Sequence, residues 1–162
     1  NQVNIQKALK GESSVGIEEG AVVKFSIRAG APLKDRSGRI IGAISMGYVL
    51  SADSFVDRQK DLLDCQVTVF QKDERISTTI IDKDGKRIVG TKLGIDTITD
   101  RVLKQGVIYY GDAMIQGMKY YTAYIPIVDT EQKIAGMLFI GREAGVIRGL
   151  INKLLLYLMY FH

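Results

Sequence analysis

The feature that most constrains this chain is an internal repeat. Residues 29–50 (AGAPLKDRSGRIIGAISMGYVL) align without a gap on residues 123–144 (AYIPIVDTEQKIAGMLFIGREA), with the same offset of 94 positions throughout. The only two prolines of the chain, Pro32 and Pro126, stand at the same place in both copies. A repeat of this kind predicts two related structural modules.

The two modules are not equally complete, because little chain precedes the first copy. We expect residues 1–50 to form the C-terminal part of a first module and residues 51–64 a linker helix. Residues 65–142 would then form a complete second module, followed by an exit helix over residues 143–162. Truncation of a longer natural chain is the simplest explanation of the shorter first module.

The pattern of apolar residues and turn formers predicts alternating strands and helices. Aspartate and glycine residues mark hairpin turns at 34–39 and 82–85. The expected helices cover residues 4–10, 53–63, 96–104 and 143–160. The expected strands cover residues 14–18, 22–28, 40–48, 66–71, 76–81, 86–90, 107–110, 119–128 and 134–140.

The end of the chain carries the apolar run LLLYLMYF at residues 154–161. Eight residues cannot cross a bilayer, which needs about 20. Two interpretations are open: a buried helix end, or the first turns of a transmembrane helix.

Composition excludes several classes of function. Positive and negative charges are interspersed and the net charge is only +4, which argues against a nucleic-acid surface. The single cysteine, Cys65, allows neither an internal disulfide nor a zinc cluster. The single histidine, His162, leaves no histidine triad or histidine metal site. Because the common nucleotide, metal and nucleophile motifs are also absent, we expect no cofactor, no metal and no enzyme activity.

The segment ERISTT contains the first candidate binding group. Alternation along a strand places Arg75, Ser77 and Thr79 on one face, with Thr78 between them. A guanidinium beside hydroxyl groups suits a carboxylate, since its planar fork bonds both oxygens and the hydroxyls add donors. The alternative is a solvated strand face with β-favouring residues.

The segment KYYTAY contains the second candidate. Alternation places Tyr120, Thr122 and Tyr124 on one face, and Lys119 and Tyr121 on the other. Aromatic walls with polar tips suit a small-ligand pocket. The alternative is a pair of tyrosines packed in the core.

Two further arginines are weaker candidates. Arg87 follows the Asp84-Gly85 turn, and the return of the chain there brings it near residues 77–79. Arg28 stands at the position of the first module that aligns with Thr122, so it is a candidate for a separate, distal site.

Several blocks of the chain resemble a known family. FSIRAGAPLKDRSGRIIGAISMGYVL, SFVDRQKDLLDCQVTVF, ERISTTIIDKDGKRIVGTK and YYGDAMIQGMKYYTAYIPIVDTEQKIAGMLFIG are similar to the extracytoplasmic Cache sensor regions of bacterial and archaeal methyl-accepting chemotaxis proteins. The resemblance covers residues 5–142 and fits a double-Cache arrangement with a truncated first module. It implies an α+β, PAS-like fold in which helices flank an antiparallel sheet. By position, the resemblance assigns ligand contacts to Arg75, Thr78, Thr79, Tyr121 and Tyr124, with Arg87 and Lys119 as softer matches.

The resemblance also implies a function. We expect an extracytoplasmic, homodimeric sensor domain of a transmembrane chemoreceptor that binds a small carboxylate or amino-acid-like ligand and signals through its C-terminal helix. The alternatives are a ligand-less dimerisation or partner-binding module, and the input domain of a sensor histidine kinase or cyclase. A polar cavity of about 300 Å³ or more favours direct binding, whereas a pocket filled by the protein's own side chains favours the ligand-less module.

Overall fold

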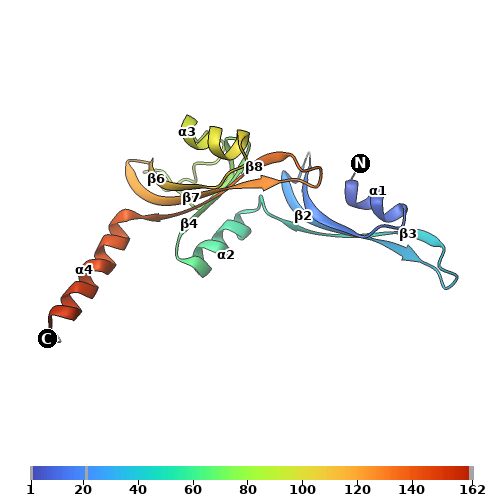
Figure 1. Ribbon diagram of the computed structural model, residues 1–162, viewed down its shortest axis with the longest axis horizontal. Coiled ribbons are helices and arrows are strands. Elements are labelled where there is room, and N and C mark those ends of the chain that lie inside the picture. The colour runs from blue at the N-terminus through green and yellow to red at the C-terminus, as the bar shows by residue number, and fades with distance from the viewer. Residues whose placement is uncertain (1, 21, 161–162) are drawn as a thin grey trace.

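The chain folds into two antiparallel sheets joined by a helix (Figure 1). The structure is a computed structural model and describes residues 2–20 and 22–160. The first sheet has the strand order β1-β2-β3, and the second has the order β5-β4-β8-β7-β6. In chain order, the elements are α1 (Val3–Leu9), β1 (Ser14–Glu19), β2 (Phe25–Lys34), β3 (Ile40–Val49), α2 (Asp53–Leu63), β4 (Gln66–Gln71), β5 (Glu74–Thr78), α3 (Asp96–Thr99), the π-helical turn η1 (Asp100–Lys104), β6 (Tyr109–Ile115), β7 (Met118–Val128), β8 (Ile134–Glu143) and α4 (Ala144–Tyr160).

The two copies of the repeat form equivalent hairpins, β2–β3 and β7–β8. Asp35 begins the first turn, and its Oδ1 accepts hydrogen bonds from the backbone N–H groups two and four residues later, at 3.0 and 2.9 Å. Asp129 does the same in the second turn, at 2.8 and 2.9 Å. A β-bulge follows Leu33 in one hairpin and Ile127 in the other, again 94 positions apart. The repeat in the sequence is therefore also a repeat in the backbone.

Helices cover both faces of the second sheet, with α2 on one side and α3 on the other (Figure 1). On the α3 side, the sheet and the following segments bury one apolar cluster, which consists of Phe70, Ile80, Ile88, Leu93, Ile98, Val102, Ala113, Ile115, Tyr120, Tyr124, Met137 and Phe139. On the α2 side lies a second cluster, which consists of Phe25, Leu50, Val56, Val67, Val69, Ile127 and Ala135.

The second cluster joins the two sheets. Phe25, the first residue of β2, is fully buried among side chains of α2 and of the second sheet. The backbone oxygen of Phe25 also accepts a hydrogen bond from the N–H of Leu50 at 2.9 Å. On the opposite side of the junction, the β7–β8 turn donates a hydrogen bond from Thr130 N to Ile17 O at 3.1 Å.

Several elements differ from the sequence prediction. The strand expected over 22–28 covers Phe25–Lys34, and the one expected over 107–110 covers Tyr109–Ile115. The strand expected over 76–81 begins at Glu74 and ends at Thr78, because the Thr79 hydroxyl accepts the backbone N–H of Val67 and replaces the next ladder bond. The strand expected over 86–90 forms only an isolated bridge. The helix expected over 96–104 is one α-turn followed by a π-turn.

The last helix, α4, leaves the second sheet and projects away from the rest of the molecule (Figure 1). Beyond its first turn most of its described apolar side chains are exposed, among them Leu150, Leu154 and Leu158. In the part of the chain that the structure describes, no helix has the length and apolar character needed to cross a membrane. Phe161, which ends the apolar run, and His162 lie outside the described residues. The continuation into a transmembrane segment stays a prediction.

Candidate functional site

Arg75 is the buried cation of the second sheet. Its side chain is only 5% exposed and lies over the ring of Phe70, the residue opposite it on β4, with 5.1 Å between the guanidinium carbon and the ring centroid. Its Nη1 donates hydrogen bonds to Thr91 Oγ1 at 3.0 Å and to the Lys92 carbonyl at 2.6 Å. Its Nε is buried without a partner among the described residues.

The electrostatics of Arg75 are those of an unpaired charge. Burial lowers the pKa of its guanidinium, and the opposing influence comes from the phenol of Tyr124. No carboxylate of the described residues forms an ion pair with it. Buried charges in proteins are normally paired or coordinated, so this guanidinium is a candidate group for binding an anion.

The prediction that Arg75, Ser77 and Thr79 share one face of the strand is wrong. A β-bulge shifts the register, so that Arg75 lies opposite Phe70 whereas Ser77 lies opposite Val69, the preceding residue of β4. Neighbouring residues of a strand point to opposite faces, so Ser77 points to the α2 side. There its hydroxyl donates to an Asp53 carboxylate oxygen of α2 at 3.1 Å.

The two threonines of the segment are engaged in structural hydrogen bonds. Thr78 lies on the Arg75 side of the sheet, where its hydroxyl is 2.6 Å from that of Thr68. Thr79 donates to Gln66 Oε1 at 2.6 Å. Neither hydroxyl lines the cavity beside Arg75.

The alternation predicted for β7 is confirmed, since Tyr120, Thr122 and Tyr124 are buried while Lys119 and Tyr121 are exposed. Tyr124 is fully buried between aromatic rings, and its hydroxyl has no partner among the residues described. Burial is the main cause that raises the pKa of Tyr124, so its phenol stays protonated. Tyr124 and Arg75 thus place two unpartnered donors in one apolar cluster.

Lys119 and Tyr121 lie away from Arg75 and Tyr124. Lys119 Nζ forms an ion pair with Asp112 at 2.5 Å and lies 5.7 Å from the centroid of the Tyr121 ring. Both side chains are on the opposite face of β7 from Tyr124. Their assignment as ligand contacts stays a prediction that this geometry does not support.

Arg87 links the segment after β5 to α2. Its Nη2 donates to both carboxylate oxygens of Asp57, at 2.8 and 2.9 Å, and its Nη1 donates to the Thr78 carbonyl at 2.8 Å. Arg87 comes near residues 77–79, as the hairpin geometry predicts, but it does not line the Arg75 cavity.

A cavity of about 220 Å³ lies beside Arg75. Sequence reasoning identified none of its other lining residues, because the segment 91–95 has no strand or helix period and reaches Arg75 only through tertiary packing. Apart from Arg75, the lining consists of Ile88, Thr91, Lys92, Leu93, Ile95, Met114, Ile115 and Gln116.

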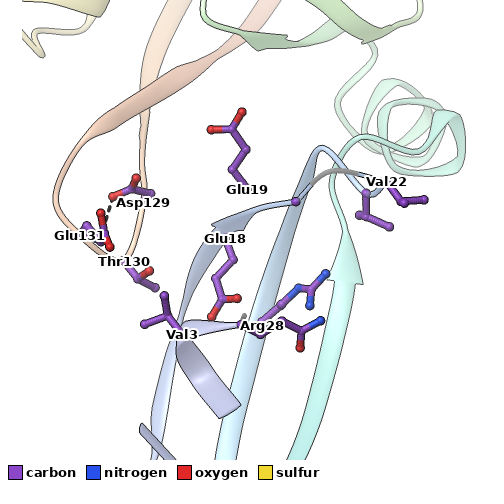
Figure 2. Close-up of a pocket in the computed structure, with 11 residues that line it drawn as sticks. Val3, Glu18, Glu19, Val22, Arg28, Asp129, Thr130 and Glu131 are labelled. Carbon is purple, nitrogen blue, oxygen red and sulfur yellow. Dashed lines mark hydrogen bonds between the residues drawn. The ribbon is translucent and has the colours of Figure 1, made fainter. Parts of the chain in front are cut away.

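Arg28 lies in a different and larger cavity, of about 540 Å³, at the junction of the two sheets. Figure 2 shows its lining from two sides: Glu18, Glu19 and Arg28 from the first sheet, and Asp129 and Glu131 from the β7–β8 turn. Four carboxylates and one guanidinium make these surroundings acidic, which disfavours an anion. Arg28 as a distal ligand residue therefore stays a prediction without geometric support.

No cluster of three or more metal-ligating side chains occurs among residues 2–20 and 22–160.

Comparison with solved structures found weak likenesses. "Methyl-accepting Chemotaxis protein X" is 15% identical, with 85% of this chain and 53% of that chain covered and a TM-score of 0.45. The ligand-binding domain of Campylobacter jejuni chemoreceptor Tlp3 in complex with L-valine is 14% identical, with 91% and 55% covered and a TM-score of 0.45. The ligand binding domain of Mlp24 with asparagine is 12% identical, with 93% and 59% covered and a TM-score of 0.42. The chain thus spans little more than half of each of these structures, and likenesses of this degree carry no argument about a ligand.

Comparison with protein families is more informative. No curated protein matches the chain. The profile of the family described as "Single cache domain 3" matches residues 49–154, which include α2 and the whole second sheet. The first sheet lies almost wholly outside this match, so its assignment as a partial module stays a prediction. The match covers more than half of the chain, which therefore belongs to the Cache family of sensor domains.

Proposed function

We propose that this chain is the extracytoplasmic sensor domain of a transmembrane chemoreceptor and that it binds a small carboxylate at Arg75. The observation that carries the proposal is the buried guanidinium of Arg75, which has no anionic partner among the described residues. A carboxylate ligand would supply the missing charge and accept a hydrogen bond from Nε. The domain works as a homodimer in this proposal.

The size of the cavity limits the ligand. Its 220 Å³ is below the roughly 300 Å³ at which a cavity favours direct binding of a typical ligand, so only a smaller molecule fits. It corresponds to roughly seven water molecules at about 30 Å³ each. Ile88, Leu93 and Ile115 make part of the wall apolar. A monocarboxylate with a short alkyl tail, such as acetate, propionate or pyruvate, fits this combination.

A route for the signal runs through the segment that lines the cavity. Thr91 and Lys92 bond Arg75, and Arg87, a few residues earlier, bonds Asp57 of α2. The C-terminal end of α2 is in turn held by Arg142, whose Nε donates to the Asp64 carbonyl at 2.9 Å. Arg142 lies two residues before α4 begins. A ligand that binds one arrangement of this chain of contacts more tightly shifts the population towards it and so moves α4.

Calorimetric titration with acetate, propionate and pyruvate tests the site. We expect saturable binding by the wild-type protein and at least about ten-fold weaker binding by Arg75→Met, because a hydrogen bond to a charged group contributes about 1.5–3 kcal/mol. Arg36→Met, which removes an exposed arginine from the β2–β3 turn, is the matched control and should bind normally. Equal binding by Arg75→Met would show that the ligand site is elsewhere.

One observation favours a ligand-less module instead. Phe70, Tyr124 and Phe139 fill the α3 face of the sheet with fully buried rings. If this alternative holds, none of the carboxylates produces a heat of binding in the titration, while sedimentation still shows a stable dimer. The input domain of a sensor kinase or cyclase would share the same binding site and differ only in its output.

A further inference from the structure

A second cavity, of about 360 Å³, lies at the end of the five-stranded sheet from which α4 departs. It shares no lining residue with the Arg75 cavity. Its walls come from α2, from the segment after β5, and from the ends of β4, β7 and β8. The lining residues that matter here are Lys60, Thr79, Ile80, Arg87, Met118, Tyr120 and Glu143.

This second cavity is lined by an ammonium and a carboxylate that form no ion pair with any of the described residues. Arg87 and Asp57, which also line it, neutralise each other at 2.8 Å. Lys60 of α2 and Glu143 of β8 have no ion-pair partner within the described part of the chain. Both also line a small neighbouring cavity, so they belong to the same region without bonding each other.

The carboxylate of Glu143 lies close to Tyr120 and to the first turn of α4. The pKa of the Tyr120 phenol is raised by burial and, after that, by the negative charge of Glu143. A Cβ placed on Gly145 would lie 3.2 Å from Glu143 Oε1, so the carboxylate lies against the first turn of α4. The unpaired anion is therefore positioned where the sheet passes into α4.

We propose that this second cavity binds a small zwitterion, whose anionic group meets the Lys60 ammonium and whose cationic group meets the Glu143 carboxylate. Ile80 and Met118 provide apolar contact for the chain between the two charges. A ligand with only one charge would interact with either Lys60 or Glu143 but not with both, which gives a physical basis for discrimination.

A zwitterion in this cavity would contact α2 and the β8–α4 junction at the same time. Lys60 is on α2, and Glu143 is the last residue of β8. Binding would therefore bias the position of α4 directly, without the segment that covers Arg75. The second cavity is a separate input to the same helix, and it shares Arg87 and Asp57 with the route from Arg75.

The chain contains methionines whose NMR signals report on the two cavities separately. Met118 lines the second cavity, Met114 lines the Arg75 cavity, and Met46 is an exposed residue of the first sheet. Methyl NMR of protein with ¹³C-labelled methionine would therefore follow both sites at once, with Met46 as an internal reference. The probes are glycine, β-alanine and 5-aminopentanoate, which differ in the distance between their charges, with pentanoate and butylamine as singly charged controls.

We expect at least one amino acid of the series to shift the Met118 signal saturably, with the singly charged controls at least about ten-fold weaker. Glu143→Gln and Lys60→Met should each weaken this binding about ten-fold or more, because each removes a charge-assisted hydrogen bond. Arg75→Met should bind the zwitterion normally. Circular dichroism checks that the variants are folded, and Lys60 is an exposed helix residue whose replacement is tolerated.

Three outcomes would overturn the proposal: no saturable shift of Met118 with any amino acid of the series, unchanged affinity in both charge variants, or loss of binding in Arg75→Met. Failure of the carboxylate site would look different, since it removes the response of Met114 to propionate and leaves that of Met118.

Discussion

Single residues decide the character of the Arg75 site. Arg75 Nε and the Tyr124 hydroxyl are buried polar atoms without partners among the residues described, and they lie in the same apolar cluster as Phe70. Such atoms are destabilising when no ligand is present, because the water they lost on folding is not replaced. Their retention in a sensor is consistent with a site that is completed by its ligand.

Tyr124→Phe tests this interpretation. Removal of the unpartnered hydroxyl should raise the free energy of unfolding of the ligand-free protein by about 1 kcal/mol, since an unsatisfied buried group costs about 1–3 kcal/mol. Urea denaturation measures this change. Tyr109→Phe is the control, because the Tyr109 hydroxyl already donates to the Asp112 carbonyl at 3.4 Å and should give no gain. A clear loss of stability in Tyr124→Phe would mean that the hydroxyl is satisfied in solution.

The alternation of side chains along a strand predicted the sheet face correctly for some of these residues and wrongly for others. It placed Tyr120, Thr122 and Tyr124 on one face because β7 is regular there. It failed for Arg75 and Ser77 because a bulge inserts one extra residue between them. A bulge depends on the partner strand, so the local sequence does not reveal it.

At the scale of elements, the two copies of the repeated hairpin have the same backbone structure but differ in how closely neighbouring strands pack against them. Gly42 and Gly136 are equivalent positions of the repeat. A Cβ at Gly42 would meet no atom within 4 Å, because no other segment covers this face of β3 at that position. A Cβ at Gly136 would clash with the Phe70 carbonyl oxygen, because the backbone of the neighbouring strand β4 approaches Gly136 of β8 very closely.

This difference predicts opposite responses to the same substitution. Gly136→Ala should destabilise the protein by about 3 kcal/mol or more, since overpacking against backbone forces the strands apart. Gly42→Ala should change stability by less than about 0.5 kcal/mol, as is usual for exposed positions. Thermal unfolding of both variants measures the contrast. Similar losses in the two would mean that the strands do not pack as described.

At the scale of the whole molecule, the two sheets share a core and are not independent. Phe25 carries the contact, because it begins a strand of the first sheet and is fully buried among residues of α2 and the second sheet. Further along the same face of the first sheet the side chains are exposed, with Met46, which pairs with Ala29 of β2, at 73% exposure. The stability of the first sheet therefore depends on the buried contact of Phe25 with α2 and the second sheet.

Phe25→Ala should cost about 3–5 kcal/mol, the usual range for loss of a buried phenylalanine. Met46→Ala, at an exposed position of the same sheet, is the control and should cost less than about 0.5 kcal/mol. Urea unfolding followed by circular dichroism measures both. A loss below about 1 kcal/mol for Phe25→Ala would indicate that the sheets are coupled by other contacts.

The sequence by itself determined the repeat, the aspartate turns, the strand alternation of β7 and the family, because these depend on neighbouring residues and on patterns that stay within one element. The tertiary structure alone decided that the second copy of the repeated hairpin, and not the first, packs tightly at its glycine. It also decided that a bulge turns Ser77 away from Arg75, and that the segment containing Thr91 contacts the Arg75 guanidinium. It also brought Lys60 and Glu143, from distant parts of the chain, to one cavity. The physical reason is that burial and the pairing of charges depend on contacts between segments far apart in sequence, which local patterns do not encode.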